Sequence, residues 1–266
     1  MSAAGTSTPA ENNGPDNNDA DNNDAEPAAT IPPVPPLRLH HVLAMTVAMT
    51  LLMGVSREWT RGGTPLDAAT VVVWSMLNAV ACSVVVFGCL WRRDGARFPS
   101  EPGHGLAILA MLNVLVSAYA RVAAEVYPPS DQREMFRWVI AGPVAFGMLV
   151  GAVAALKLRR RAADSRAWRW VFVTNAGSAA CYGCMIVAFT VAWDFWIPWR
   201  LAMFFYYASA AIGVAASLLC LAAVYFDWRL ERRRSWSHWL VIATGMAAGV
   251  LHHARKLGWI LTEDIS

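Results

Sequence analysis

The feature that most constrains this chain is a series of seven apolar runs, separated by short polar connections, that fills the sequence after residue 37. Each run is close to the 17–25 residues that an α-helix needs to cross the hydrocarbon core of a bilayer. Hydrophobic residues make up 56% of the chain and charged residues 15%, which excludes an ordinary soluble domain. The pattern therefore predicts an all-α fold, a polytopic integral membrane bundle of about seven transmembrane helices. The runs lie at 39–56, 68–91, 104–126, 135–158, 168–191, 200–227 and 236–258.

Residues 1–37 have a different composition from the rest of the chain. They are rich in Asn, Asp, Ala and Pro, and they carry six acidic residues but no Lys or Arg. Such a segment buries too little apolar surface to offset the entropy lost on ordering. It also lacks the positively charged start of a secretory signal. We therefore predict a disordered acidic tail over 1–37, followed by a transmembrane domain over 38–266.

The basic residues indicate how the chain is oriented in the membrane. Fourteen Lys and Arg lie at Arg38 and in the connections 92–103, 157–169 and 228–235, whereas the opposite side holds seven. Positively charged connections remain in the cytoplasm. We therefore predict a cell inner membrane protein with a cytoplasmic N-terminus and an external C-terminus. Its expected partner is the lipid bilayer rather than nucleic acid, because the basic residues lie in short loops between apolar runs.

Four polar residues interrupt the third apolar run at a constant spacing of four. They are Asn113, Ser117, Arg121 and Glu125. Each step of four residues turns a helix about 40° past a full circle, so these residues form one slowly drifting stripe. Ionisable side chains inside a span are costly unless they face protein or water. We therefore expect neighbouring helices to cover this stripe.

The predicted topology places other ionisable residues at the same side of the membrane as Arg121 and Glu125. The first helix ends outward at Arg57, and the seventh carries His252 in its outer half. Arg57, Asn113, Arg121, Glu125 and His252 are therefore the candidate ligand-binding residues of an outer-facing polar cavity. Such a cavity suits an anionic or zwitterionic ligand, or a proton relay. Alternatively, Arg121 and Glu125 pair within their own helix as a structural contact, or extend to the headgroups.

These residues favour a small-solute or ion transporter, or a membrane sensor. The chain has no P-loop, HExxH or GxSxG motif, and we assign no catalytic residue. The short connections also leave no room for a soluble catalytic domain. An enzyme is therefore not indicated.

Two alternatives remain beside transport or sensing. One is a redox or haem-bearing membrane subunit that would use His252, His253 and the CxxC motif of Cys181 and Cys184. The motif lies near the middle of a span, and the other histidines lie at the opposite ends of their helices, so we predict no metal and no cofactor. The other alternative is a structural subunit whose polar stripes only fix the assembly of a membrane complex.

Small-residue pairs predict where helices approach closely. Gly147 and Gly151 are four residues apart, as are Gly245 and Gly249. Such pairs let helix backbones meet, either within one chain or between two copies. Self-association through one of these pairs is therefore a further expectation.

Local signals predict details of the helix ends. Ser165 and Ser235 occupy positions typical of an N-cap, the residue that precedes a helix and accepts hydrogen bonds from its first turn. Prolines are expected in connections, because proline ends helices; they are Pro65, Pro102, Pro128, Pro129 and Pro198. Pro143 lies inside the fourth run and predicts a kink there.

Overall fold

The structure, a computed structural model, describes most of the chain beyond the tail. It covers residues 37–56, 65–126, 137–161, 163, 165–192 and 196–263, except for the side chains at 53–56, 65–67, 125, 137–138, 191–192, 196–198 and 252–263. All of these residues belong to one compact unit, Pro32–Ser266. The predicted tail over 1–37, apart from its last residue, lies outside the described residues.

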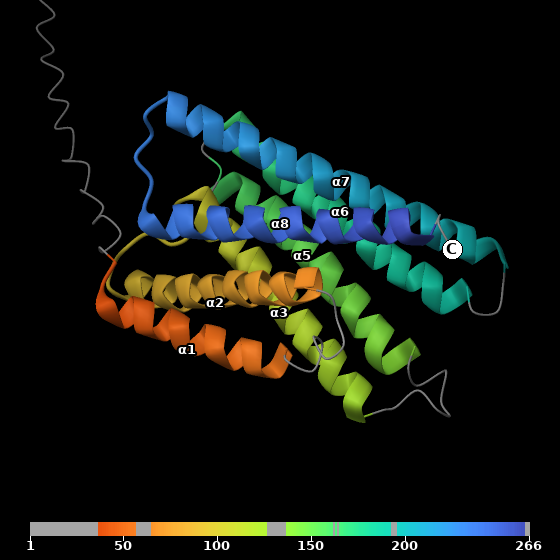
Figure 1. Cartoon of the computed structure of the whole chain (residues 1–266). Coiled ribbons are helices and arrows are strands. Elements are labelled where there is room, and N and C mark those ends of the chain that lie inside the picture. Colours follow the sequence, from red (N-terminus) through yellow and green to blue (C-terminus); the bar gives the residue numbers. More distant parts are fainter. Residues whose placement is uncertain are drawn as a thin grey trace, which may run out of the picture. The chain divides into compact units, whose positions relative to one another are not determined.

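Within these ranges the chain is almost entirely helical and contains no strand (Figure 1). A π-helical turn, η2, leads directly into α5, so the described residues form seven helices when these two are taken together. Each helix overlaps one of the seven predicted runs, which confirms the all-α bundle. The elements are α1 (Leu39–Ser56), α2 (Pro65–Arg93), α3 (Pro102–Val126), η2 (Arg137–Ala141), α5 (Gly142–Arg161), α6 (Arg166–Ala192), α7 (Trp196–Arg229) and α8 (Trp236–Glu263).

Five of the described helices are long and apolar enough to cross a membrane, which confirms a multi-pass membrane protein. The described apolar stretches of α1 and α8, Leu39–Leu52 and Trp236–Leu251, are shorter. The five long spans are Ala68–Arg93, Pro102–Ala124, Val139–Arg161, Arg166–Thr190 and Trp199–Arg229.

The ends of helices that are distant in sequence meet at one end of the bundle, on the left of Figure 1. We call it the polar end: α1, α3, α6 and α8 begin there, and α2 and α7 end there. The ring of His41, near the start of α1, packs against Phe87 and Trp91 near the end of α2, with ring centroids 4.4 and 5.7 Å away. It also lies 5.6 Å from the ring of Trp236 at the start of α8. Successive helices therefore run in opposite directions.

Burial along α3 is concentrated at the polar end. Residues 102–105 and Ala107 are buried, whereas beyond them Ala123 is the one buried residue among the described side chains of this helix. The largest fully buried side chains of the described residues, Trp168 and Phe172, also lie near this end, in the first two turns of α6. The polar end is therefore the tightly packed part of α3 and its surroundings.

The two serines predicted to cap helices do so. The backbone N–H of Trp168 donates to Oγ of Ser165 at 3.4 Å, and that of His238 donates to Oγ of Ser235 at 3.3 Å. These bonds satisfy N–H groups of the first turns of α6 and α8, which have no partner within their own helices.

The predicted positions of three prolines are wrong, whereas Pro128 and Pro129 lie outside the described residues. Pro65 and Pro102 are the first residues of α2 and α3, and Pro198 is the third residue of α7, rather than members of the connections. Proline is compatible with a first helical turn, because the N–H that it lacks would have no partner there. Pro143 lies inside α5 just after the π-helical turn, so the fourth span departs from a regular α-helix next to this residue. The kink expected at Pro143 stays a prediction.

Candidate functional site

The predicted polar stripe on α3 is only partly covered by other helices. Asn113 and Arg121 are half-buried, and Ser117 is exposed. The expectation that neighbouring helices cover the stripe therefore fails at Ser117. The reason is that α3 is enclosed by its neighbours mainly over its first two turns, whereas the stripe lies in the middle and last part of the helix.

The other predicted ligand-binding residues lie outside the part of the chain that carries a full description. Arg57 is outside the described residues, and for Glu125 and His252 the backbone is described but not the side chain. Whether these residues approach Asn113 and Arg121 therefore stays a prediction.

Several other polar side chains in the described spans are bonded within their own helix. The hydroxyl of Thr46 donates to the carbonyl of Val42 at 2.9 Å, and the same pattern occurs at Thr50, Thr174, Asn175 and Thr244. A polar contact between two helices joins Ser178 of α6 to Ser209 of α7, whose hydroxyls donate to each other's carbonyls at 3.2 and 3.1 Å. These residues therefore satisfy the backbone or pair helices, and they outline no site.

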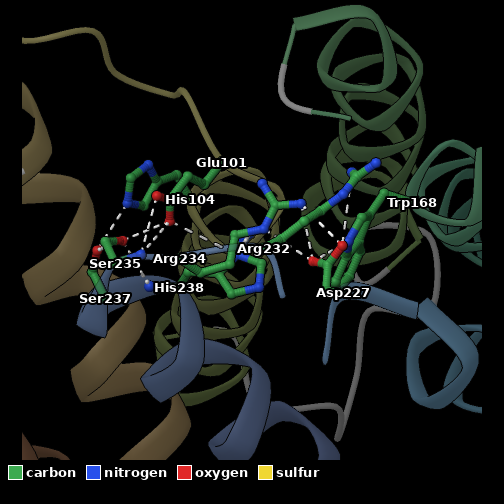
Figure 2. A network of polar contacts seen from close by, with 10 residues as sticks. Glu101, His104, Trp168, Asp227, Arg232, Arg234, Ser235, Ser237 and His238 are labelled. Carbon is green, nitrogen blue, oxygen red and sulfur yellow. Dashed lines mark hydrogen bonds and ion pairs between the residues drawn. The ribbon is translucent and has the colours of Figure 1, made fainter. Parts of the chain in front are cut away.

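The densest group of polar side chains instead lies at the polar end, and we call it the polar network (Figure 2). It joins the residues before α3 and α8, the first turns of α3, α6 and α8, and the end of α7. His104, Trp168, Asp227, Ser237 and His238 are each at most 1% exposed. The members are Glu101, His104, Trp168, Asp227, Arg232, Arg234, Ser235, Ser237 and His238.

Glu101, immediately before α3, caps the start of α8. Its carboxylate accepts hydrogen bonds from the backbone N–H of Ser235 at 3.1 and 3.2 Å and from the Ser235 hydroxyl at 2.6 Å. A negative charge is favourable there, because the first turn of a helix carries unpaired N–H groups and the positive end of the helix dipole.

His238, in the first turn of α8, caps the start of α3 in turn. Its Nδ1 accepts the backbone N–H of Gly103 at 3.0 Å. A Cβ atom at residue 103 would lie 2.6 Å from Cα and 2.8 Å from the carbonyl oxygen of His238, so only glycine allows the two backbones to come this close. The starts of α3 and α8 therefore cap each other.

The contact with Gly103 defines the protonation state of His238. A nitrogen that accepts a hydrogen bond carries a lone pair and no proton, so the ring is neutral with its proton on Nε2. The nearest carboxylate oxygen, Oε2 of Glu101, lies 3.9 Å from the same Nδ1. That distance is too long for a hydrogen bond.

His104 extends the polar network into the buried part of α3. Its Nε2 lies 2.8 Å from Oγ of Ser237, and Oγ of Ser237 lies 2.9 Å from Oγ of Ser235. The Ser235 hydroxyl in turn donates to Glu101. These four side chains form a continuous hydrogen-bonded row, while Nδ1 of His104 has no hydrogen-bond partner among the described residues.

Asp227 anchors the other half of the polar network, at the end of α7. One carboxylate oxygen accepts hydrogen bonds from the indole N–H of Trp168 and from Nε of Arg234, both at 2.9 Å, and the other accepts from Nη2 of Arg234 at 3.1 Å. A buried carboxylate at a helix C-terminus is unfavourable by itself, so the two-pronged bond to Arg234 compensates its charge. The Trp168 ring lies 5.4 Å from the His238 ring, which connects the two halves.

Sequence reasoning identified part of this arrangement but missed the polar network itself. It predicted the cap at Ser235, and it placed the connections that hold Glu101 and Arg234 on the same side of the membrane. The pairing of Glu101 with Ser235, 134 residues apart, has no local signal. The available hint was that Glu101 and Ser235 are polar residues, each of which precedes a predicted helix start on the same side of the membrane.

The side chains that could bind a metal or carry redox chemistry do not cluster among the described residues. No group of three or more His, Cys, Asp or Glu there could hold a metal ion. Cys181 and Cys184 are half-buried free thiols on α6.

Comparison of the chain with known proteins finds no relative. It matches no protein-family model, no curated protein and no solved structure.

The glycine pairs contact neighbouring helices of the same chain at three of four positions. A Cβ at Gly147 would collide with Val116 of α3, and Cβ atoms at Gly245 and Gly249 would lie within ordinary contact distance of neighbouring helices. At Gly151 an added Cβ would meet nothing within 4 Å. These contacts explain three of the small residues without a second copy of the chain.

Proposed function

We propose that this chain is a membrane transporter or sensor for a small anionic or zwitterionic solute, with a polar vestibule around Asn113, Ser117 and Arg121. The observation that supports this proposal most is the uneven burial of α3. The helix is enclosed at the polar end and open over the part that carries the stripe. A cationic side chain, that of Arg121, lies in that open part and is half-buried.

The energetic cost of placing the Arg121 guanidinium in an apolar span supports a functional role for the stripe. A guanidinium inside an apolar span is costly unless water, protein or a partner charge surrounds it. Arginine also matches carboxylate and phosphate groups with two parallel hydrogen bonds, which suits an anionic ligand. The half-burial of Arg121 near the exposed Ser117 is compatible with a water-filled vestibule.

Cysteine accessibility tests the vestibule without knowledge of the ligand. In a variant that lacks the five native cysteines, we would introduce Ser117→Cys and Arg121→Cys, with Leu115→Cys and Val122→Cys as controls on the apolar face of the same helix. Leu115 and Val122 are 55% and 61% exposed, so steric access does not limit them. We expect a charged, membrane-impermeant thiol reagent to modify the stripe positions and not the controls. Equal, slow modification at all four positions would show that the stripe faces lipid, and the vestibule would then be rejected.

Arg121 also provides a test of ligand binding. Thermal unfolding in detergent would be measured with a panel of free amino acids and dicarboxylates, since a ligand that binds only the folded state raises its stability, by about 2.7 kcal/mol at a hundred times its Kd. We expect at least one anionic or zwitterionic compound to raise the unfolding temperature of the parent chain but not of Arg121→Gln. An equal rise in both proteins would remove Arg121 from the binding site.

A structural subunit of a membrane complex is the second candidate, and the self-bonded polar residues favour it. Thr46, Thr50 and Thr244 satisfy carbonyls of their own helices, as side chains with purely structural roles do. The haem-bearing alternative depends on His252 and His253, whose side chains lie outside the described residues. An absorption spectrum of the purified protein tests that alternative, because bound haem absorbs strongly in the visible range.

A further inference from the structure

We propose that His238 is a proton-sensing residue, and that protonation of its Nδ1 releases the start of α3 from the start of α8. This proposal does not rest on the vestibule, because it concerns the opposite end of α3. The ligand of the site is the proton, and its binding atom is the nitrogen that accepts the N–H of Gly103.

Two partners compete for this one nitrogen. The Gly103 N–H, at 3.0 Å, requires an unprotonated Nδ1. The Glu101 carboxylate, with Oε2 at 3.9 Å, would instead attract a protonated one. The neutral and the protonated ring therefore have different best partners, and both partners belong to the segment at the start of α3. Figure 2 shows Glu101 and His238 in the polar network.

Protonation changes the contacts in a defined order. A proton from water adds to the lone pair of Nδ1, and the imidazole becomes a cation with an N–H on each ring nitrogen. The N–H of Gly103 then faces another N–H and loses its acceptor. The cation draws the Glu101 carboxylate about 1 Å closer to reach charge-assisted hydrogen-bond distance. That carboxylate is the group that now accepts three hydrogen bonds from Ser235.

The packing at Gly103 prevents a small adjustment from restoring the first contact. The backbones of Gly103 and His238 are already too close for even a Cβ atom between them. A ring that rotates toward Glu101 therefore leaves the N–H of Gly103 without a partner, unless α3 moves away from α8 and admits water. Because α3 is buried mainly at this end, such a movement shifts the helix that carries Asn113 and Arg121.

Other charged groups near His238 are already engaged. On the α7 side, the charge of Asp227 is compensated by Arg234, with Nη1 of Arg232 3.8 Å from its carboxylate. On α3, His104 bonds Ser237, and on α6 the neutral Trp168 covers the His238 ring. Glu101 is therefore the carboxylate placed to stabilise the protonated state of His238.

Hydrogen–deuterium exchange of the full chain in lipid nanodiscs tests the proposal. Exchange of peptides that cover 101–106 would be compared at about pH 8 and about pH 5.5, on either side of the range in which histidine titrates, with correction for the pH dependence of chemical exchange. In the parent chain we expect exchange at pH 5.5 to be faster by several-fold, up to about tenfold, because the N–H of Gly103 loses its acceptor.

Two substitutions separate His238 from the other titrating groups. In His238→Asn, the amide oxygen takes the place of Nδ1 and can accept the Gly103 N–H, but it cannot be protonated. We expect the peptides that cover 101–106 to exchange slowly at both pH values in this variant. His104→Gln removes the other buried histidine of the polar network while keeping a group in the place of its Nε2. We expect it to retain the pH effect of the parent chain.

Three results would overturn the proposal: no pH effect in the parent chain, an unchanged pH effect in His238→Asn, or its loss in His104→Gln. If His238→Asn does not fold, Glu101→Gln provides an independent test, because it removes the charge that favours the protonated ring. We expect its exchange transition to shift to lower pH. An unshifted transition would exclude competition between Glu101 and Gly103 for Nδ1.

Discussion

At the scale of single residues, the contact between Gly103 and His238 leaves the least room for change. In Gly103→Ala, the new Cβ would press on backbone atoms of His238, which cannot rotate away. We expect a loss of about 1–3 kcal/mol in the free energy of unfolding, the usual range for overpacking. Gly151→Ala is the control, because its Cβ meets nothing within 4 Å, and it should be neutral or stabilising by up to about 1 kcal/mol. Thermal unfolding in detergent measures both; equal effects would contradict the close approach of α3 and α8.

Asp227 supports a second prediction at this scale. Its carboxylate and the Arg234 guanidinium are 2% and 8% exposed, and they pair at 2.9 Å. Asp227→Asn would leave a buried guanidinium without its counter-charge, so we expect a cost of about 3–5 kcal/mol in the free energy of unfolding. Glu231→Gln removes the same charge four residues later, at an exposed position beyond the end of α7, and should leave the unfolding temperature unchanged. A small effect at Asp227 would show that water already reaches the pair.

What the sequence revealed about single residues was limited to local signals. The caps at Ser165 and Ser235 were predictable, because an N-cap and its N–H donor lie three residues apart in the chain. Contacts such as Glu101 with Ser235 depend on how two helix starts come together, which no local pattern encodes. The openness of α3 at Ser117 depends in the same way on where its neighbours diverge.

At the scale of elements, the helices were predictable because membrane thickness fixes their length and their apolar composition. The errors lie at the ends. Polar or proline-containing first turns, as at Pro102 and Pro198, were assigned to connections, although an initial turn tolerates both. In the fourth span a kink was expected at Pro143, because a missing N–H inside a helix disturbs its hydrogen bonds, and the structure has a π-helical turn beside this residue.

Pairing between elements gives a third prediction, at Ser178 and Ser209. Each hydroxyl bonds the other residue's carbonyl, so the two serines should be energetically coupled between α6 and α7. In a double-mutant cycle with Ser178→Ala and Ser209→Ala, we expect a coupling energy of about 0.6–1.7 kcal/mol. Thr174→Val is the control partner, because the Thr174 hydroxyl bonds carbonyls of its own helix. Additive effects of the two serine substitutions would show that the contact contributes nothing.

At the scale of the whole molecule, the described bundle places helix ends together as the alternating connections predicted. The end of α2 meets the start of α8 through Trp91 and Trp236, with ring centroids 6.2 Å apart, and the end of α7 meets the start of α6 through Asp227 and Trp168. Alternation follows from the sequence, because each short connection must return the chain across the bilayer. The concentration of buried polar groups at one end does not follow, since it arises from contacts between distant segments.

The orientation of this bundle in the membrane supplies the last prediction. Seven predicted spans would place the two chain ends on opposite sides, and the basic connections next to the polar end favour the cytoplasm for that end. Single cysteines at the exposed positions Ser100, Arg161 and Arg233, in a cysteine-free background, should therefore be labelled in intact cells only after the membrane is permeabilised. A cysteine at Ser266 should be labelled before permeabilisation. If Ser266→Cys were labelled only after permeabilisation, like the other three, an even number of spans would be required. Labelling of Arg161→Cys from outside would reverse the predicted orientation. The reversed orientation would place the part of α3 that carries Arg121 on the cytoplasmic side, whereas an even number of spans with the polar end in the cytoplasm would leave that part facing outward. The proton-dependent contact of His238 with Gly103 would be unaffected in both cases.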